Sequence, residues 1–187
     1  MTADAPRRVF LVGPMGSGKT TLGRRAARAL GLEFIDCDEE IERRTGASVN
    51  LIFDIEGEAG FRTREHQLLS ELSERDDVLI ATGGGVVTQP GNRDLLRDRG
   101  LVVWIPASVH QQLRRLEMDR KRPLLQAPDR RARLEAMARE RNPLYEAVAD
   151  LVFRSRHRGV AQAANALAEA IREEGMPAPS DPTDPTS

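Results

Sequence analysis

A lysine closes a glycine-rich stretch near the start of the chain. Residues 13–20 read GPMGSGKT and satisfy the pattern G-x-x-x-x-G-K-[ST]. Backbone N–H groups of such a stretch surround phosphate oxygens, and the positive end of the following helix adds to their attraction. Lys19 is expected to reach the β- and γ-phosphates of a nucleotide, and the Thr20 hydroxyl to hold Mg²⁺. The predicted nucleotide-binding residues are Gly16, Ser17, Gly18, Lys19, Thr20 and Thr21.

Two carboxylates, Asp36 and Asp38, follow the next short apolar run. Residues two apart in an extended segment point the same way, and ligands of open parallel sheets bind beyond the carboxyl ends of the strands. One acid could help to hold Mg²⁺ through water. The other could accept a proton from an acceptor hydroxyl or hydrogen-bond to it. The alternative is that Asp38 merely caps the next helix.

Three further stretches combine arginine, glycine and proline. GEAGFRTRE (57–65) puts Phe61 and Arg62 on a helix, with Glu65 one turn later, where it is expected to pair with Arg62. IATGGGVV (80–87) ends an apolar run in three glycines, whose bare backbone lets a ligand approach closely. RKRPLL (120–125) lies in a proline-rich loop and RERNPLY (139–145) on the helix after it.

Short apolar runs must carry these residues, and amphipathic stretches separate the runs. Strands are predicted at 8–12, 32–35, 78–81, 101–105 and 151–153, and helices at 18–30, 38–45, 49–55, 58–74, 90–99, 108–118, 129–148 and 160–171. Pro143 is expected to break or kink the helix that contains it. This alternation predicts an α/β fold, a five-stranded parallel sheet with helices on both faces.

Composition limits the classes of function. The chain of 187 residues suits one domain, and its net charge of −1 gives no reason to expect nucleic acid. The only cysteine, Cys37, is expected to pack in the core, and the scattered histidines predict no zinc site. Without a membrane-spanning run or a secretory signal, a cytoplasmic protein is expected. We predict a single domain at 1–174 and a disordered proline-rich tail at 175–187.

Taken together, these motifs resemble the shikimate kinase family. Its pattern is a phosphate loop, D-x-D, G-E-x-x-F-R-x-x-E, G-G-G, R-P-L-L and R-x-P-L-Y, and all six occur here in that order. The first is common to many NTPases, whereas the other five together are specific. The resemblance implies a three-layer P-loop kinase with a mobile lid at about 119–128. It also implies ATP-dependent phosphorylation of the 3-hydroxyl of shikimate in chorismate and aromatic amino-acid synthesis, with Mg²⁺ as cofactor and a monomeric enzyme.

The resemblance also implies roles for individual residues. Asp38 is similar to the family acid that hydrogen-bonds the shikimate hydroxyls and acts as base, or only positions them, and Asp36 to the acid that orders Mg²⁺. Arg62 and Arg141 resemble the pair that binds the shikimate carboxylate. Gly84 resembles the residue whose main chain contacts shikimate.

Two arginines would serve the nucleotide. Arg122 is similar to the lid arginine that moves onto the phosphates, and would be catalytic together with Lys19 and Asp38. The adenine contact falls on Arg158 by spacing from Arg141, with Arg156 as the second choice.

Two other functions remain open at the level of sequence. A gluconate kinase uses a similar phosphate loop, but is not expected to carry the D-x-D, F-R, G-G-G and R-P-L-L set together. A regulatory nucleotide switch would need no second anion site, whereas the arginines predict one.

Overall fold

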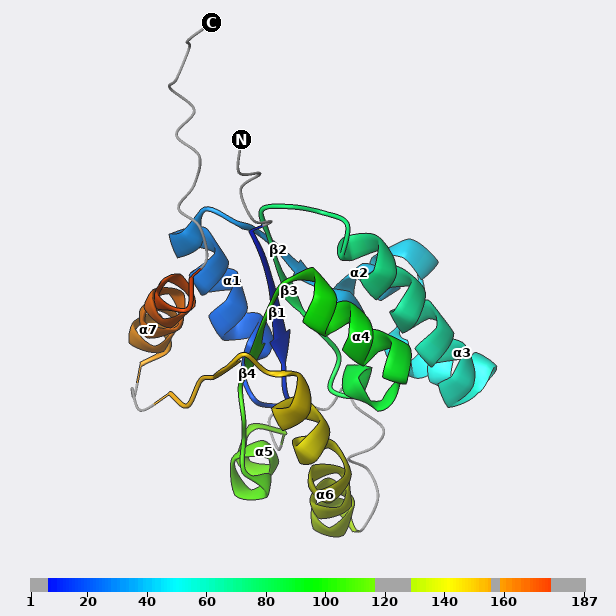
Figure 1. Ribbon diagram of the computed structural model, residues 1–187. Coiled ribbons are helices and arrows are strands. Elements are labelled where there is room, and N and C mark those ends of the chain that lie inside the picture. Colours follow the sequence, from blue (N-terminus) through cyan, green and yellow to red (C-terminus); the bar gives the residue numbers. More distant parts are fainter. Residues whose placement is uncertain (1–6, 117–128, 156–158, 176–187) are drawn as a thin grey trace, which may run out of the picture.

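The protein is described by a computed structural model that covers residues 7–116, 129–155 and 159–175. Its centre is a parallel sheet in the order β2-β3-β1-β4-β5 (Figure 1). The strands are β1 (Arg8–Val12), β2 (Glu33–Asp36), β3 (Val78–Ala81), β4 (Leu101–Trp104) and β5 (Leu151–Val152). The predicted α/β class and the five-stranded parallel sheet are confirmed, with shifts of one residue at some strand ends.

Helices cover both faces of the sheet. They are α1 (Lys19–Leu30), α2 (Cys37–Thr45), α3 (Val49–Leu72), the short 3-10 helix η1 (Val86–Thr88), α4 (Pro90–Arg99), α5 (Val109–Leu116), α6 (Arg130–Val148) and α7 (Val160–Glu173). Helices α1 and α7 lie side by side on one face, and α3 and α4 cover the other (Figure 1). Helices α5 and α6 lie beyond the carboxyl ends of the strands, next to the glycine-rich loop.

Strand β1 shows how one short apolar run builds both layers. All five of its residues are buried, as expected for a central strand of a parallel sheet. Val9 and Leu11 pack into the core under α1 and α7. Phe10 and Val12 pack into the core under α2, α3, α4 and the end of α6. The strand that delivers the phosphate loop is therefore held from both sides.

Two helical regions can be compared with the sequence-based expectation. The predicted helices at 49–55 and 58–74 lie within α3 and are separated by a kink at Gly57, whose φ of 71° is left-handed, so the predicted division is confirmed. Pro143 lies inside α6, which extends from Arg130 to Val148, so the predicted break is wrong, while the alternative of a kink stays a prediction. Proline removes one backbone donor, but burial of Leu134 and Tyr145 on either side of Pro143 holds the helix together.

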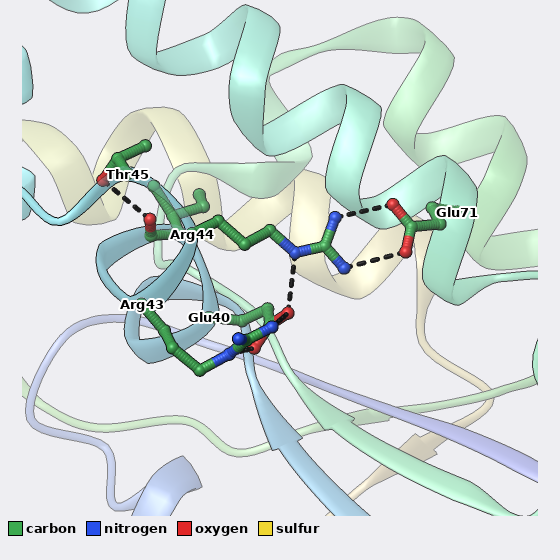
Figure 2. A network of polar contacts seen from close by, with 6 residues as sticks. Glu40, Arg43, Arg44, Thr45 and Glu71 are labelled. Atoms are coloured by element: carbon green, nitrogen blue, oxygen red, sulfur yellow. Dashed lines mark hydrogen bonds and ion pairs between the residues drawn. The ribbon is translucent and has the colours of Figure 1, made fainter.

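Helix α2 is anchored at its end by a network of charged side chains (Figure 2). The Arg44 guanidinium donates to both carboxylate oxygens of Glu71 on α3, at 2.6 and 2.8 Å, and its Nε donates to Glu40 at 2.6 Å. Hydrogen bonds from Arg43 and Arg44 lower the pKa of Glu40 to about 2. The network ties the end of α2 to α3, while the start of α2 lies at the edge of the sheet where the strands end.

The described residues contain no helix that is both long enough and apolar enough to cross a membrane. The predicted lid at 119–128 lies outside the described residues, and so does all but the first residue of the predicted tail at 175–187.

Candidate active site

The glycine-rich loop joins β1 to α1, as the sequence predicts. Gly13, Gly16 and Gly18 have positive φ values of 146°, 72° and 96°, so the backbone makes turns that other residues rarely adopt. The Lys19 ammonium donates to the carbonyls of Gly13 and Pro14 at 2.7 and 2.8 Å. Its charge therefore lies inside the curve of the loop. Gly18 caps the start of α1 without any side-chain hydrogen bond, so the positive end of the helix faces the loop.

Thr20 and Asp36 lie together beside the loop. The Thr20 hydroxyl donates to Asp36 Oδ2 at 2.6 Å, and Asp36 Oδ1 accepts from the backbone N–H groups of Asp38 and Glu39. Asp36, and not Asp38, is therefore the residue that caps α2, so the alternative role of Asp38 as a helix cap is wrong. A hydroxyl and one carboxylate suit Mg²⁺, which takes few protein ligands beside waters and phosphate oxygens.

Asp38 lies in the first turn of α2, close to the glycine run and to Glu65. A methyl group added at Gly83 would meet Asp38 Oδ1 at 3.2 Å and Glu65 Oε1 at 2.6 Å. Glycine is needed at Gly83 because the two carboxylates occupy the space of a side chain. Burial raises the pKa of Glu65, and the neighbouring Arg62 guanidinium offsets this only in part.

Arg62 extends from α3 against the same glycine run. It donates to Glu65 Oε2 at 2.7 Å and to Glu58 at 3.3 Å, which confirms the predicted pairing with Glu65. A methyl group added at Gly85 would come within 2.1 Å of Arg62 Nη2. Arg62 Nε is one of the buried atoms for which the described structure contains no hydrogen-bond partner. Because buried donors are normally paired, this guanidinium has hydrogen-bonding capacity left for a ligand.

Arg141 and Tyr145 approach from α6, one turn apart. The Tyr145 hydroxyl donates to the carbonyl of Gly84, and both residues line a small cavity with Pro14 and Met15 of the phosphate loop. A methyl group added at Gly84 would lie 3.3 Å from the Met15 backbone nitrogen. Within the described structure, Arg141 Nε is also buried without a partner. Asp38, Arg62, Gly84 and Arg141 therefore gather around the glycine run, beside the phosphate loop.

Two residues at this site were not singled out from the sequence. Burial raises the pKa of the Tyr145 phenol, which stays a donor to Gly84. Its position at the end of RNPLY is the only signal that could have indicated it. Arg115 of α5 donates to the carbonyl of Gly16 at 2.5 Å and so adds a cation beside the loop. In an arginine-rich chain no pattern distinguishes Arg115 from its neighbours.

Three of the arginines predicted from the sequence lie outside the described residues, and Cys37 is not part of the site. Arg122, Arg158 and Arg156 lie outside the described residues. Cys37 is buried as expected, and burial raises the pKa of its thiol, so it is a packing residue. The described residues contain no group of three or more histidine, cysteine, aspartate or glutamate side chains that could hold a metal.

Comparisons with known proteins agree with one another. A family model described as shikimate kinase matches residues 15–172. The shikimate kinase of Halorhodospira halophila is 54% identical over 167 residues, which cover 89% of this chain and 94% of that protein. Shikimate kinase 1 of Sodalis glossinidius is 51% identical over 163 residues, which cover 86% of this chain and 94% of that protein.

Solved structures give the same result. The shikimate kinase of Acinetobacter baumannii in complex with shikimate superposes with a TM-score of 0.86 at 43% identity, covering 92% of this chain and 96% of that one. A sugar kinase from Janibacter, at 18% identity and a TM-score of 0.59, shares the fold alone. The sequence relatives, the family model and the fold identify one group of enzymes. The chain belongs to the shikimate kinase family.

Proposed function

We propose that this protein transfers the γ-phosphate of ATP to the 3-hydroxyl of shikimate, giving shikimate 3-phosphate, ADP and a proton. The observation that carries the proposal is the group of acceptor-side residues beside the phosphate loop. Asp38, Arg62 and Arg141 come from three different helices and gather at the glycine run. A switch protein would need no such anion-binding set. Membership of the shikimate kinase family supports the same conclusion.

On the acceptor side, Arg62 and Arg141 bind the carboxylate of shikimate. A guanidinium offers two parallel N–H donors to a carboxylate, and both arginines keep a buried nitrogen that has no partner among the described residues. Glu65 holds Arg62 in place through its ion pair. The backbone of Gly84 faces the ring of the substrate, since the absence of a side chain there allows close approach.

On the nucleotide side, the phosphate loop from Gly16 to Thr21 binds the phosphates through its backbone N–H groups. The Lys19 ammonium stabilises the charge that spreads over the transferred group. Arg115 adds positive charge next to Gly16. Arg122 and Arg158, which lie outside the described residues, are proposed for the phosphates and for adenine.

Thr20 and Asp36 would hold Mg²⁺, the hydroxyl directly and the carboxylate through water. When bound, the ion would neutralise charge on the β- and γ-phosphate oxygens. The 2.6 Å hydrogen bond between the two side chains supports this assignment, because it brings both oxygens to one point beside the loop.

Asp38 orients the attacking hydroxyl and accepts its proton as the new P–O bond forms and the bond to the leaving ADP oxygen breaks. Its place in the first turn of α2 is fixed by Asp36, which accepts its backbone N–H at 3.0 Å. Phosphoryl transfer depends mainly on position and on cations around the transferred group. The proposed catalytic set is therefore Asp38 with Lys19 and Arg122.

A coupled assay tests this proposal. ADP release from MgATP is measured with shikimate, with gluconate and without an acceptor. We expect stimulation by shikimate only, and a phosphorylated product with the mass of shikimate 3-phosphate. Stimulation by gluconate but not by shikimate would assign the protein to the other kinase reaction. ADP release that neither acceptor changes would favour a nucleotide switch.

The proposal treats residues 1–174 as one catalytic domain that works as a monomer. Sedimentation of the purified chain, alone and with both substrates, tests whether the protein is a monomer in solution. The lid at about 119–128, the tail after residue 174 and a cytoplasmic location remain predictions.

A further inference from the structure

Side chains hold the backbone carbonyls at the end of the glycine run and just after it. Gly85, Val86 and Val87 each offer a carbonyl, and each accepts a hydrogen bond from a different side chain. Thr88 Oγ1 donates to Gly85 at 2.7 Å, Asn92 Nδ2 to Val86 at 2.9 Å and Arg93 Nη1 to Val87 at 2.7 Å. Side chains from η1 and from the start of α4 thereby hold the end of the glycine run and the residues that follow it.

Asn92 is the buried member of this set. It has no solvent exposure, and both ends of its amide are used. While Nδ2 donates to Val86, Oδ1 lies 2.7 Å from His66 Nδ1. Because Oδ1 can only accept, His66 Nδ1 must carry the hydrogen. The His66 ring also lies 3.4 Å from the place where a side chain at Gly91 would begin.

His66 directly follows Glu65 on α3, and Glu65 pairs with Arg62. Arg62 in turn packs against Gly85 so closely that Gly85 admits no side chain. The amide of Asn92 therefore joins the two halves of the proposed carboxylate site, which are the glycine run and the α3 turn that carries Arg62. The glycine run and this turn of α3 do not belong to the same strand or helix, so side-chain contacts must hold them together.

We propose that Asn92 is a positioning residue for the acceptor substrate, which sets the glycine run relative to Arg62. The inference rests on the proposed function for its kinetic consequence, but the positions of the two segments can be measured without activity. Loss of the amide leaves the Val86 carbonyl without its buried donor, so the run can shift. The nucleotide side is built mainly by the other loop, so we expect it to change less than the acceptor side.

The test compares Asn92→Ala with Ser73→Ala. Ser73 is also fully buried, and its hydroxyl donates to the Ser70 carbonyl at 2.7 Å, at the far end of α3. We expect Asn92→Ala to raise the KM for shikimate about tenfold, a factor that corresponds to about 1.4 kcal/mol. The KM for MgATP should change by less than about twofold, and Ser73→Ala should leave both values near wild type.

Hydrogen exchange over residues 82–89 gives a second readout that needs no turnover. Asn92→Ala should speed exchange in this segment, whereas Ser73→Ala should not. If the wild type failed to use shikimate, the proposed function would be wrong while the exchange result still tested the positioning. Equal increases in both KM values, or unchanged exchange at 82–89, would overturn the inference. If Asn92→Ala does not fold, His66→Ala replaces it, with His66→Gln as the variant that restores an N–H donor.

Discussion

At the scale of single residues, the site consists of charged groups that are held before any substrate arrives. Arg62 is fixed by Glu65 and Glu58, and Asp38 by the backbone bond to Asp36. Such preorganisation matters because phosphoryl transfer depends on position more than on covalent chemistry. Each of these side chains can therefore be tested by a change that alters one contact and leaves its support in place.

Removing the guanidinium in Arg62→Ala should lower kcat/KM for shikimate about 100-fold, because a charged pair with the substrate carboxylate is lost. Binding of MgATP should stay near wild type. Arg64→Ala is the matched control, since Arg64 lies on the same helix, is exposed and pairs with Glu56. Steady-state kinetics with both substrates distinguish the two variants. Equal effects of the two substitutions would show that Arg62 does not bind the substrate carboxylate.

The Asp38→Asn variant keeps the shape of the side chain and removes its charge. We expect turnover to fall by a factor of about 10² to 10⁴, the usual contribution of a positioned general base. Affinity for MgATP, measured by calorimetry, should change little. A large loss of nucleotide affinity would instead indicate that Asp38 serves the metal.

Burial raises the pKa of Glu65, and the direction of this shift fixes a pH dependence. A carboxyl group whose pKa is higher in the folded state than in the unfolded state stabilises the fold fully below its unfolded pKa of about 4.3. This stabilisation is lost as the pH rises through the pKa of the folded state. Relative to Glu65→Gln, the wild type should therefore lose stability between about pH 5 and about pH 8. Urea unfolding at both pH values measures the difference. A difference in the free energy of unfolding between the two proteins that does not change with pH would contradict the burial argument.

At the scale of elements, helix α2 is fixed at both ends. Asp36 caps its start beside Thr20, and Arg44 ties its end to Glu71 on α3 (Figure 2). Exposed ion pairs usually contribute little, but this one is bidentate and continues through Glu40. The element that carries Asp38 is thus held by a charge-assisted contact at the end opposite to Asp38.

Replacing Arg44 by glutamine should lower the free energy of unfolding by about 1 kcal/mol at low salt. The loss should shrink in about 0.5 M NaCl, since salt screens partly exposed charges. Arg43→Gln serves as the comparison because, among the described residues, the ion pair of Arg43 lies within α2, with Glu40. Urea titrations at the two salt concentrations measure both effects. A loss that salt does not change would show that Arg44 acts by packing.

The elements themselves could be predicted from apolar runs and helical spacing, because these patterns express burial directly. The exceptions have physical causes. The capping role of Asp36 could not be separated from a capping role of Asp38 by sequence alone, since both acids lie at the start of the same helix. The persistence of α6 through Pro143 depends on the tertiary burial of Tyr145. The contact of Tyr145 with Gly84 joins segments far apart in the sequence, and no local pattern encodes it.

At the scale of the whole molecule, one sheet brings together residues from most of the chain. The described segments form two large cores, one on each face of the sheet, and a small third cluster around Leu116 and Leu134. The proposed site lies at the carboxyl ends of the strands. This is where ligands bind in open parallel sheets. The last element of this architecture is α7, which packs on α1 and ends at Glu173.

A chain that ends at Gly175 should therefore keep the fold and the activity. The sequence beyond it contains four prolines among small polar residues, a composition that cannot bury a core. We expect a melting temperature within about 2 °C of the full chain and an unchanged kcat/KM. A truncation that removes α7 as well should not fold, since Leu167 and Ile171 are fully buried. Loss of activity in the chain that ends at Gly175 would place the end of the catalytic domain beyond residue 175.

The central place of β1 affects how the protein is made. Its first residue pairs with Val78 of β3, and its last with Trp104 of β4. The phosphate loop attached to β1 is translated before both neighbours of the strand, β3 and β4. Contacts this distant along the chain slow folding, because long loops must close before any pairing is gained. The segment that is proposed to bind ATP therefore depends on strands that are translated after it.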